Sequence, residues 1–138
     1  MKHNEPTFHC PNGDTRVYRG VLIGTREYEG GFFKVEMRLS REFPFNPPQV
    51  TWYTRIWHPN ISDPSLHVCE SILTKDWTPA LNVFSIVEAL RNLLANPNPS
   101  SPLNPLAAEQ FDHDRRRYER TISEYIRNYA RPEDNFWK

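Results

Sequence analysis

At residues 31–39 the chain reads Gly-Phe-Phe-Lys-Val-Glu-Met-Arg-Leu, an alternation of apolar and polar side chains. One predicted face carries Phe33, Val35, Met37 and Leu39, and the other carries Phe32, Lys34, Glu36 and Arg38. A period of two residues is typical of an antiparallel strand with one face in the core and the other in solvent. The stretch therefore predicts a half-buried antiparallel sheet as the framework of the fold.

The segments around this stretch extend the predicted sheet. Residues Arg16–Ile23 are rich in β-branched and apolar side chains, which indicates a preceding strand. Gly24–Gly31 provides the turn between the two strands. Gln49–Thr54 indicates a further strand after a proline-rich loop. The sequence thus predicts an antiparallel meander of at least three strands.

Helices are predicted after the strands, which gives the α+β class. Apolar side chains recur at helical spacing over Val83–Ala95, with Asn82 as N-cap and Asn96-Pro97 as terminator. Asn104 and Asp114 are the predicted N-caps of two later helices. The last helix would carry an apolar stripe of Tyr118, Ile122, Tyr125, Ile126 and Tyr129.

Length and composition restrict the functional classes. The 138 residues suit one domain, expected to span residues 1–138. Lys and Arg number 17, as do Asp and Glu, which argues against a general nucleic-acid binder. No apolar run approaches the roughly 18 residues of a membrane span, and residues 1–10 contain no signal-peptide core. We therefore expect no membrane partner, and a cytoplasmic or nuclear location.

The motifs for nucleotide and metal chemistry are missing from the sequence. It has no Gly-x-x-x-x-Gly-Lys-[Ser/Thr], Cys-x-x-Cys or His-Glu-x-x-His motif, so we expect no cofactor, no metal and no activation of substrate by ATP. Cys10 and Cys69 are each either a buried apolar residue or a reactive thiol. His67 would share a face with Cys69 in an extended segment, which leaves a thiol hydrolase open.

Several segments in a fixed order resemble ubiquitin-conjugating enzymes, from about Tyr18 to Ala130. They are Tyr28–Phe33, Phe43–Pro48, Ile56–Ile61 with its His-Pro-Asn, Cys69 followed by Ser71–Leu73 and Trp77–Ala80, and Pro97–Asn104. The resemblance implies the ubiquitin-conjugating fold, in which an antiparallel meander is flanked by helices. It also implies a transferase that carries a modifier on a cysteine.

The resemblance assigns roles to individual residues. An activating enzyme would pass ubiquitin or a ubiquitin-like protein to Cys69 as a thioester, which a lysine amine or a ligase then receives. Asn60 would stabilise the oxyanion or hold the loop that does so, and a well-placed donor contributes ~3 kcal/mol. Ser101 occupies a position where many family members carry Asp to orient the amine. His58 and Pro59 would shape the active-site loop.

A second set of residues matches the family's ligase-binding positions. Phe45, Pro79 and Ala80 are similar to residues that meet RING-type or HECT-type ligases. An exposed Phe beside a rigid Pro-Ala corner would form a small apolar anchor. The alternative is that Phe45 is buried under its neighbouring prolines.

The chain departs from the family pattern in three places. No amphipathic helix is predicted before the first strand, because Pro6 and Pro11 disfavour a helix there. Ile61–Val68 is one residue longer than usual and lacks the customary Gly, so that Asp63-Pro64 would form another turn. Glu70 stands where Leu is common. These departures leave open a binding module with the same fold but little or no activity.

Overall fold

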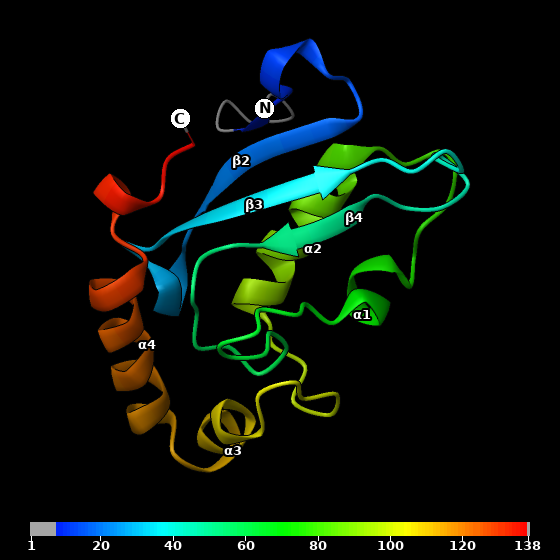
Figure 1. The fold of residues 1–138 in the computed structure, drawn as a ribbon. Helices are drawn as coiled ribbons and strands as arrows, with labels where there is room; N and C mark the ends of the chain where they lie inside the picture. Colours follow the sequence, from blue (N-terminus) through cyan, green and yellow to red (C-terminus); the bar gives the residue numbers. More distant parts are fainter. Residues whose placement is uncertain (1–7, 138) are drawn as a thin grey trace.

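A computed structural model describes residues 8–137 of the chain (Figure 1). Its antiparallel sheet has the order β1-β2-β3-β4, so the predicted meander is confirmed. The strands are β1 (Phe8–His9), β2 (Val17–Ile23), β3 (Phe32–Arg38) and β4 (Gln49–Trp52). β1 is too short to show a period and was not predicted. The expected lack of an amphipathic helix before Arg16 is confirmed for residues 8–15, where the structure has β1 and a short 3-10 turn, whereas residues 1–7 lie outside the described residues.

The helices are α1 (Glu70–Thr74), α2 (Val83–Ala95), α3 (Pro105–His113) and α4 (Arg115–Tyr129), with 3-10 turns η1 (Pro11–Gly13), η2 (Arg26–Tyr28) and η3 (Pro132–Asp134). α2, α3 and α4 begin at the predicted caps, whereas α1 was not predicted. The side chains of Asn82, Asn104 and Asp114 each accept a backbone N–H in the first turn of α2, α3 and α4 respectively. The short helix α1, directly after Cys69, was missed because one turn and a half shows no apolar period.

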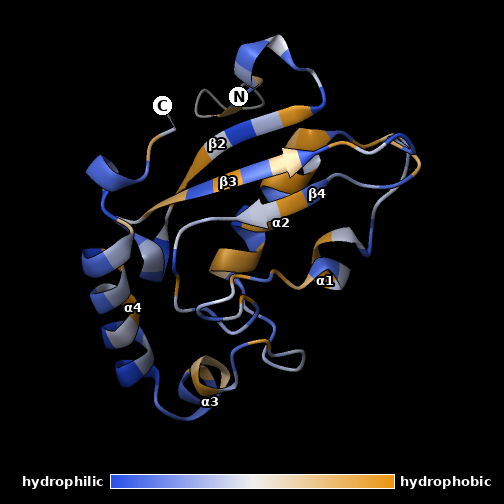
Figure 2. Cartoon of the chain, in the orientation of Figure 1, coloured by the Kyte–Doolittle hydropathy of each residue, from blue (hydrophilic) through white to orange (hydrophobic). Residues whose placement is uncertain are grey.

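The core lies between the inner face of the sheet and α2. Phe33, Val35 and Met37 are fully buried, as their alternation predicts, whereas Leu39 is only partly buried. α2 lies behind the sheet and is strongly apolar, while α4 is mostly polar (Figure 2). Within residues 8–137, no helix is long and apolar enough to cross a membrane.

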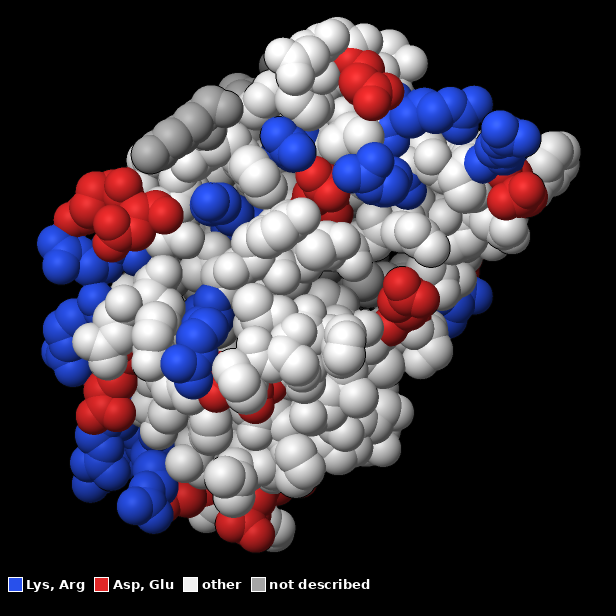
Figure 3. Space-filling view, in the orientation of Figure 1, with Lys and Arg blue, Asp and Glu red and all other residues white. Residues whose placement is uncertain are grey.

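The outer face of the sheet contains one buried carboxylate. The alternation predicts Glu36 in solvent, but it is only 5% exposed. Arg19 Nε donates to Glu36 Oε2 at 2.9 Å, and Arg38 Nη2 lies 3.3 Å from Glu36 Oε1. Basic and acidic side chains lie together over the strands in Figure 3. Glu36 is therefore buried beneath its own cationic partners, which sequence spacing alone does not reveal.

The C-terminal segment, residues 130–137, folds back over this outer face. Trp137 Nε1 donates to the Gly20 carbonyl at 2.7 Å. The Arg19 guanidinium and the Lys34 ammonium each lie 4.9 Å from the centre of a Trp137 ring. Thr54 Oγ1 donates to Asn135 Oδ1 at 2.7 Å, and the Asn135 side chain also donates to the carbonyls of Tyr129, at the end of α4, and Arg131. These contacts cover part of the outer face with residues far away in the sequence.

A buried pair of tyrosines positions the segment that enters the site. The Tyr28 hydroxyl donates to the Trp57 carbonyl at 2.6 Å and lies 3.1 Å from the Tyr118 hydroxyl. The Tyr28 ring also packs against the His58 imidazole, with 5.8 Å between centroids. The residues before Asn60 are thereby held between η2 and α4.

Candidate active site

Cys69 lies at the N-cap position of α1 and is half-buried. Its Sγ is 3.4 Å from the Ser71 hydroxyl oxygen. Its backbone N–H donates to the Asn60 carbonyl at 3.1 Å, which places the thiol segment directly beside Asn60. Cys69 and Cys10 are both free thiols. Glu70, which follows the thiol, is exposed to solvent.

The chain between Asn60 and Cys69 returns on itself. Ile61 forms an isolated antiparallel bridge with Val68, and the Ser62 N–H donates to the His67 carbonyl at 3.0 Å. The turn expected at Asp63-Pro64 is present over residues 63–65. The loop over residues 61–68 therefore places Cys69 beside Asn60.

The Asn60 side chain is fully buried and holds a second loop. Its Nδ2 donates to the carbonyls of Asn98 at 2.7 Å and Ser101 at 3.1 Å. Its Oδ1 accepts the Asn98 N–H at 2.8 Å. A carboxamide has two N–H donors, and both are engaged here. This geometry favours the loop-holding alternative over direct donation to an oxyanion.

His58 and Pro59 connect the Asn60 segment to α2 and to the residues that precede α3. His58 Nε2 donates to the Leu93 carbonyl at 2.8 Å, and Nδ1 accepts the Asn60 N–H at 2.9 Å. The Pro59 carbonyl accepts the N–H groups of Leu103 at 2.8 Å and Asn104 at 3.1 Å. Because both imidazole nitrogens are engaged, His58 is not available as a base for Cys69, and His67, on which the hydrolase alternative rests, has an exposed side chain.

The burial of His58 predicts a loss of stability in acid. Burial lowers the pKa of His58 from 6.5 to about 4, and the hydrogen bond to Leu93 opposes this effect only in part. Below pH 6.5 the unfolded state gains a proton that the folded state does not bind. This stabilisation is complete above pH 6.5 and is lost as the pH falls towards 4, at a cost of about 3 kcal/mol.

Urea unfolding at pH 7 and pH 4 measures this effect. His58→Gln should lose less free energy of unfolding over this interval than the unsubstituted protein, although it starts from a lower value. His67→Gln is the control, because His67 is exposed. Equal pH dependence in all three proteins would contradict the assignment.

Ser101 is joined to the site through its backbone. Its carbonyl accepts from Asn60, and its own N–H donates to the Asn98 carbonyl at 3.3 Å. Its side chain is exposed to solvent. Cys69, Asn60 and Ser101 are thus brought together, with Asn60 as the residue that contacts the segments of both others.

The residues predicted to bind a ligase lie on exposed loops. Phe45 is 76% exposed, so the alternative that its prolines bury it is wrong. Pro79 and Ala80 are also exposed. Trp77 connects the two loops, because its Nε1 donates to the Pro44 carbonyl at 2.9 Å. This role was missed, since a single tryptophan carries no sequence signal for a partner so far along the chain.

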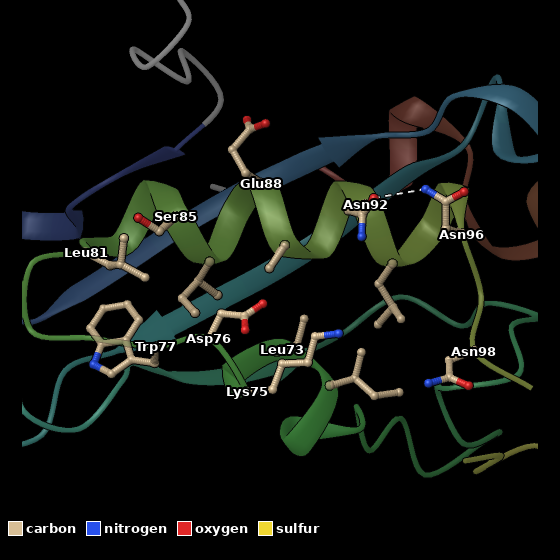
Figure 4. Close-up of a pocket in the computed structure, with 14 residues that line it drawn as sticks. Leu73, Lys75, Asp76, Trp77, Leu81, Ser85, Glu88, Asn92, Asn96 and Asn98 are labelled. Atoms are coloured by element: carbon tan, nitrogen blue, oxygen red, sulfur yellow. Dashed lines mark hydrogen bonds between the residues drawn. The ribbon is translucent and has the colours of Figure 1, made fainter. Parts of the chain in front are cut away.

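A groove of about 470 Å³ runs between α2 and the segment from α1 to Trp77 (Figure 4). Its apolar lining includes Ile72, Leu73, Trp77, Leu81 and Ala89, and its polar lining includes Lys75, Asp76, Glu88, Asn92 and Asn98. One boundary is α1, which follows Cys69, and another is Asn98, which Asn60 binds. The groove therefore borders both halves of the site. Among residues 8–137, no group of three or more His, Cys, Asp or Glu side chains is arranged to hold a metal ion.

Comparison with known proteins agrees with this geometry. The sequence profile of the family described as ubiquitin-conjugating enzyme matches residues 3–126. The chain is 38% identical over 108 residues to ubiquitin-conjugating enzyme E2-23 kDa of Triticum aestivum, a match that covers 78% of this chain and 59% of that protein. It is 36% identical over 126 residues to ubiquitin-conjugating enzyme E2 6 of Arabidopsis thaliana, covering 89% of this chain and 69% of that protein.

Solved structures show the same fold. A Plasmodium yoelii protein assigned to the ubiquitin conjugating enzymes superposes with a TM-score of 0.81 and 28% identity, over 90% of this chain and 82% of that chain. The E2 domain of a Toxoplasma gondii ubiquitin conjugating enzyme also gives 0.81, with 29% identity, over 90% of this chain and 87% of that chain. These matches confirm the predicted fold, and they show that the chain belongs to the ubiquitin-conjugating enzyme family.

Proposed function

We propose that this chain accepts ubiquitin or a ubiquitin-like modifier from an activating enzyme as a thioester on Cys69. The observation that carries this proposal is the half-buried free thiol whose N–H is bound to Asn60, the residue that also holds the loop over residues 98–101. The thiolate attacks the incoming thioester carbonyl and the activating enzyme's thiol leaves. Because one thioester replaces another, no strong local base is needed.

The second step transfers the modifier to a substrate lysine or to a ligase. A lysine amine attacks the thioester carbonyl, and the carbonyl oxygen becomes negative in the tetrahedral intermediate. We propose that Asn60 acts by holding the loop over residues 98–101, and that the Ser101 hydroxyl helps to orient the amine. His58 fixes the Asn60 segment to α2 through the Leu93 carbonyl, and the Pro59 carbonyl holds Leu103 and Asn104, which follow that loop.

The exposed Phe45, Pro79 and Ala80 suit a RING-type or HECT-type ligase. The hydrogen bond from the Trp77 indole to the Pro44 carbonyl joins the two loops that carry these residues. Residues 1–138 would form one catalytic domain that acts in the cytoplasm or nucleus and requires no cofactor of its own.

A charging assay tests this proposal. The protein is mixed with an activating enzyme, ATP and ubiquitin and is run on a non-reducing gel. We expect a band that a reducing thiol removes, that is lost in Cys69→Ala and that remains in Cys10→Ala. The absence of this band, with ubiquitin and with other modifiers paired with their own activating enzymes, would favour a binding module.

A further inference from the structure

We infer that Asp63 is a positioning residue for the thiol segment. It is held against α4 and determines the course of the loop over residues 61–68, and hence the place of Cys69. The residues that hold it, together with Asp63 itself, form the Asp63 cluster: Arg55, Asp63, Tyr125 and Tyr129. This inference rests on the proposed function for its activity measurement but not for its structural one.

The carboxylate of Asp63 receives three donors. Arg55 Nε lies 3.0 Å from Oδ1 and Arg55 Nη2 lies 3.1 Å from Oδ2, which is a bidentate pair. The Tyr125 hydroxyl donates to Oδ2 at 2.6 Å. The Asp63 side chain is only 11% exposed, so solvent competes weakly for these bonds. The loop is thereby tied to a helix 62 residues further along the chain.

Arg55 is itself fixed by the same helix. Its guanidinium lies 4.4 Å from the centre of the Tyr129 ring and 5.4 Å from that of Tyr125. Its Nη1 donates to the Tyr129 hydroxyl at 3.0 Å. The arginine therefore meets Asp63 in one orientation, with its planar fork set by two aromatic rings.

The charge states suit a permanent contact at neutral pH. Burial alone would raise the pKa of Asp63, but hydrogen bonds from Arg55 and Tyr125 outweigh burial and lower it. Burial and the bond to Asp63 raise the pKa of Tyr125 to about 12, so its hydroxyl keeps the proton it donates. The cluster is thus an ionised carboxylate with three donor groups, from the two residues Arg55 and Tyr125.

The loop needs such an anchor because of its own sequence. It contains no glycine, and Leu66 has a φ of 61°, a region that is costly for a side chain of this size. A strained residue persists only where its surroundings hold it. The base of the loop is closed by the Ile61 and Val68 bridge and by the bond from Cys69 to Asn60. The Asp63 cluster supplies the second anchor, at the turn.

Two measurements in a Cys10→Ala background test the inference. The first is the rate at which iodoacetamide alkylates Cys69, which needs no partner protein. The second is single-turnover discharge of the charged protein to free lysine. The variants are Asp63→Ala, Asp63→Asn and Tyr125→Phe. Glu133→Gln is the matched control, because it breaks an exposed Arg–Glu pair elsewhere on the chain.

We expect Asp63→Ala to change the alkylation rate severalfold and to lower discharge about tenfold, because a small misplacement of reacting groups is costly. Asp63→Asn, which retains one acceptor for Arg55, and Tyr125→Phe should lie between Asp63→Ala and the unsubstituted protein. Glu133→Gln should change neither rate.

If Asp63 only stabilised the fold, the three substitutions would lower the unfolding temperature. They would leave the rates of alkylation and discharge unchanged under conditions in which all variants are folded. That result would overturn the inference. If Asp63→Ala does not fold, the rates of Tyr125→Phe and Asp63→Asn test whether Asp63 positions Cys69. If the unsubstituted protein does not charge, the proposed function fails, but alkylation still tests whether Asp63 positions Cys69.

Discussion

Asn60→Ala should lower the discharge of charged protein to lysine by about two orders of magnitude, with a much smaller effect on charging. The substitution removes three hydrogen bonds to the loop over residues 98–101. A loop that moves by about 1 Å at a reacting centre can cost about 100-fold in rate. Charging depends less on this loop, because its nucleophile is the thiolate of the chain itself, whereas discharge must also orient an incoming amine. Rapid-quench discharge with excess lysine measures the loss.

The control separates this effect from general destabilisation. Loss of the Asn60 amide removes the hydrogen bonds that it makes with the Asn98 N–H, the Asn98 carbonyl and the Ser101 carbonyl, and the net cost of each is about 0.5–1.5 kcal/mol. Asn128→Ala removes an exposed asparagine from α4 and should leave both steps unchanged. Asn60→Asp keeps the acceptor for the Asn98 N–H but loses both donors, so it should resemble Asn60→Ala. Equal losses in charging and discharge would contradict the loop-holding role.

Phe45→Ala should lower ligase-stimulated discharge by about 30-fold at limiting ligase. Phe45 is 76% exposed, on a loop that the Trp77 indole holds against the neighbouring loop. An aromatic side chain that fills a pocket at the centre of an interface typically contributes about 2 kcal/mol or more, which corresponds to about 30-fold in affinity. Titration of a RING-type ligase into charged protein, followed by the rate of discharge, measures the change.

Phe136 offers a matched control for this substitution. It is 54% exposed and lies against Phe32 on another part of the sheet. Phe136→Ala should therefore leave ligase stimulation unchanged, and neither variant should alter charging. If charging and stimulated discharge fell together in Phe45→Ala, the residue would be part of the fold or of the thiol site and not a ligase anchor.

The elements with a clear period were predictable from the sequence, and those set by distant partners were not. The alternation in β3 and the apolar stripe of α2 each describe a face that must be buried, so both elements appear where expected. β1 and α1 are too short to display a period. Glu36 was expected in solvent but is buried, because its partner Arg19 lies on a neighbouring strand, 17 residues away.

The same distinction applies to the candidate site. The resemblance to the family implied that Cys69, Asn60 and Ser101 lie near one another, and the structure brings their segments into contact. The resemblance did not show that both N–H groups of the Asn60 amide are engaged, because Asn98 and Ser101 lie 38 and 41 residues further along. The sequence also did not predict the contacts of Asp63, since Tyr125 is 62 residues away. Residue type and order are local information, whereas hydrogen-bond partners require the fold.

The bond between Trp137 and Gly20 joins residues 117 positions apart, and this separation matters while the protein is being made. Translation proceeds at about 5–20 residues per second, so roughly 6–23 s pass between the synthesis of these two residues. During that interval the outer face of β2 and β3 has no cover from residues 130–137. The nascent sheet is therefore open to association with other chains until residues 130–137 have been synthesised and have folded over it.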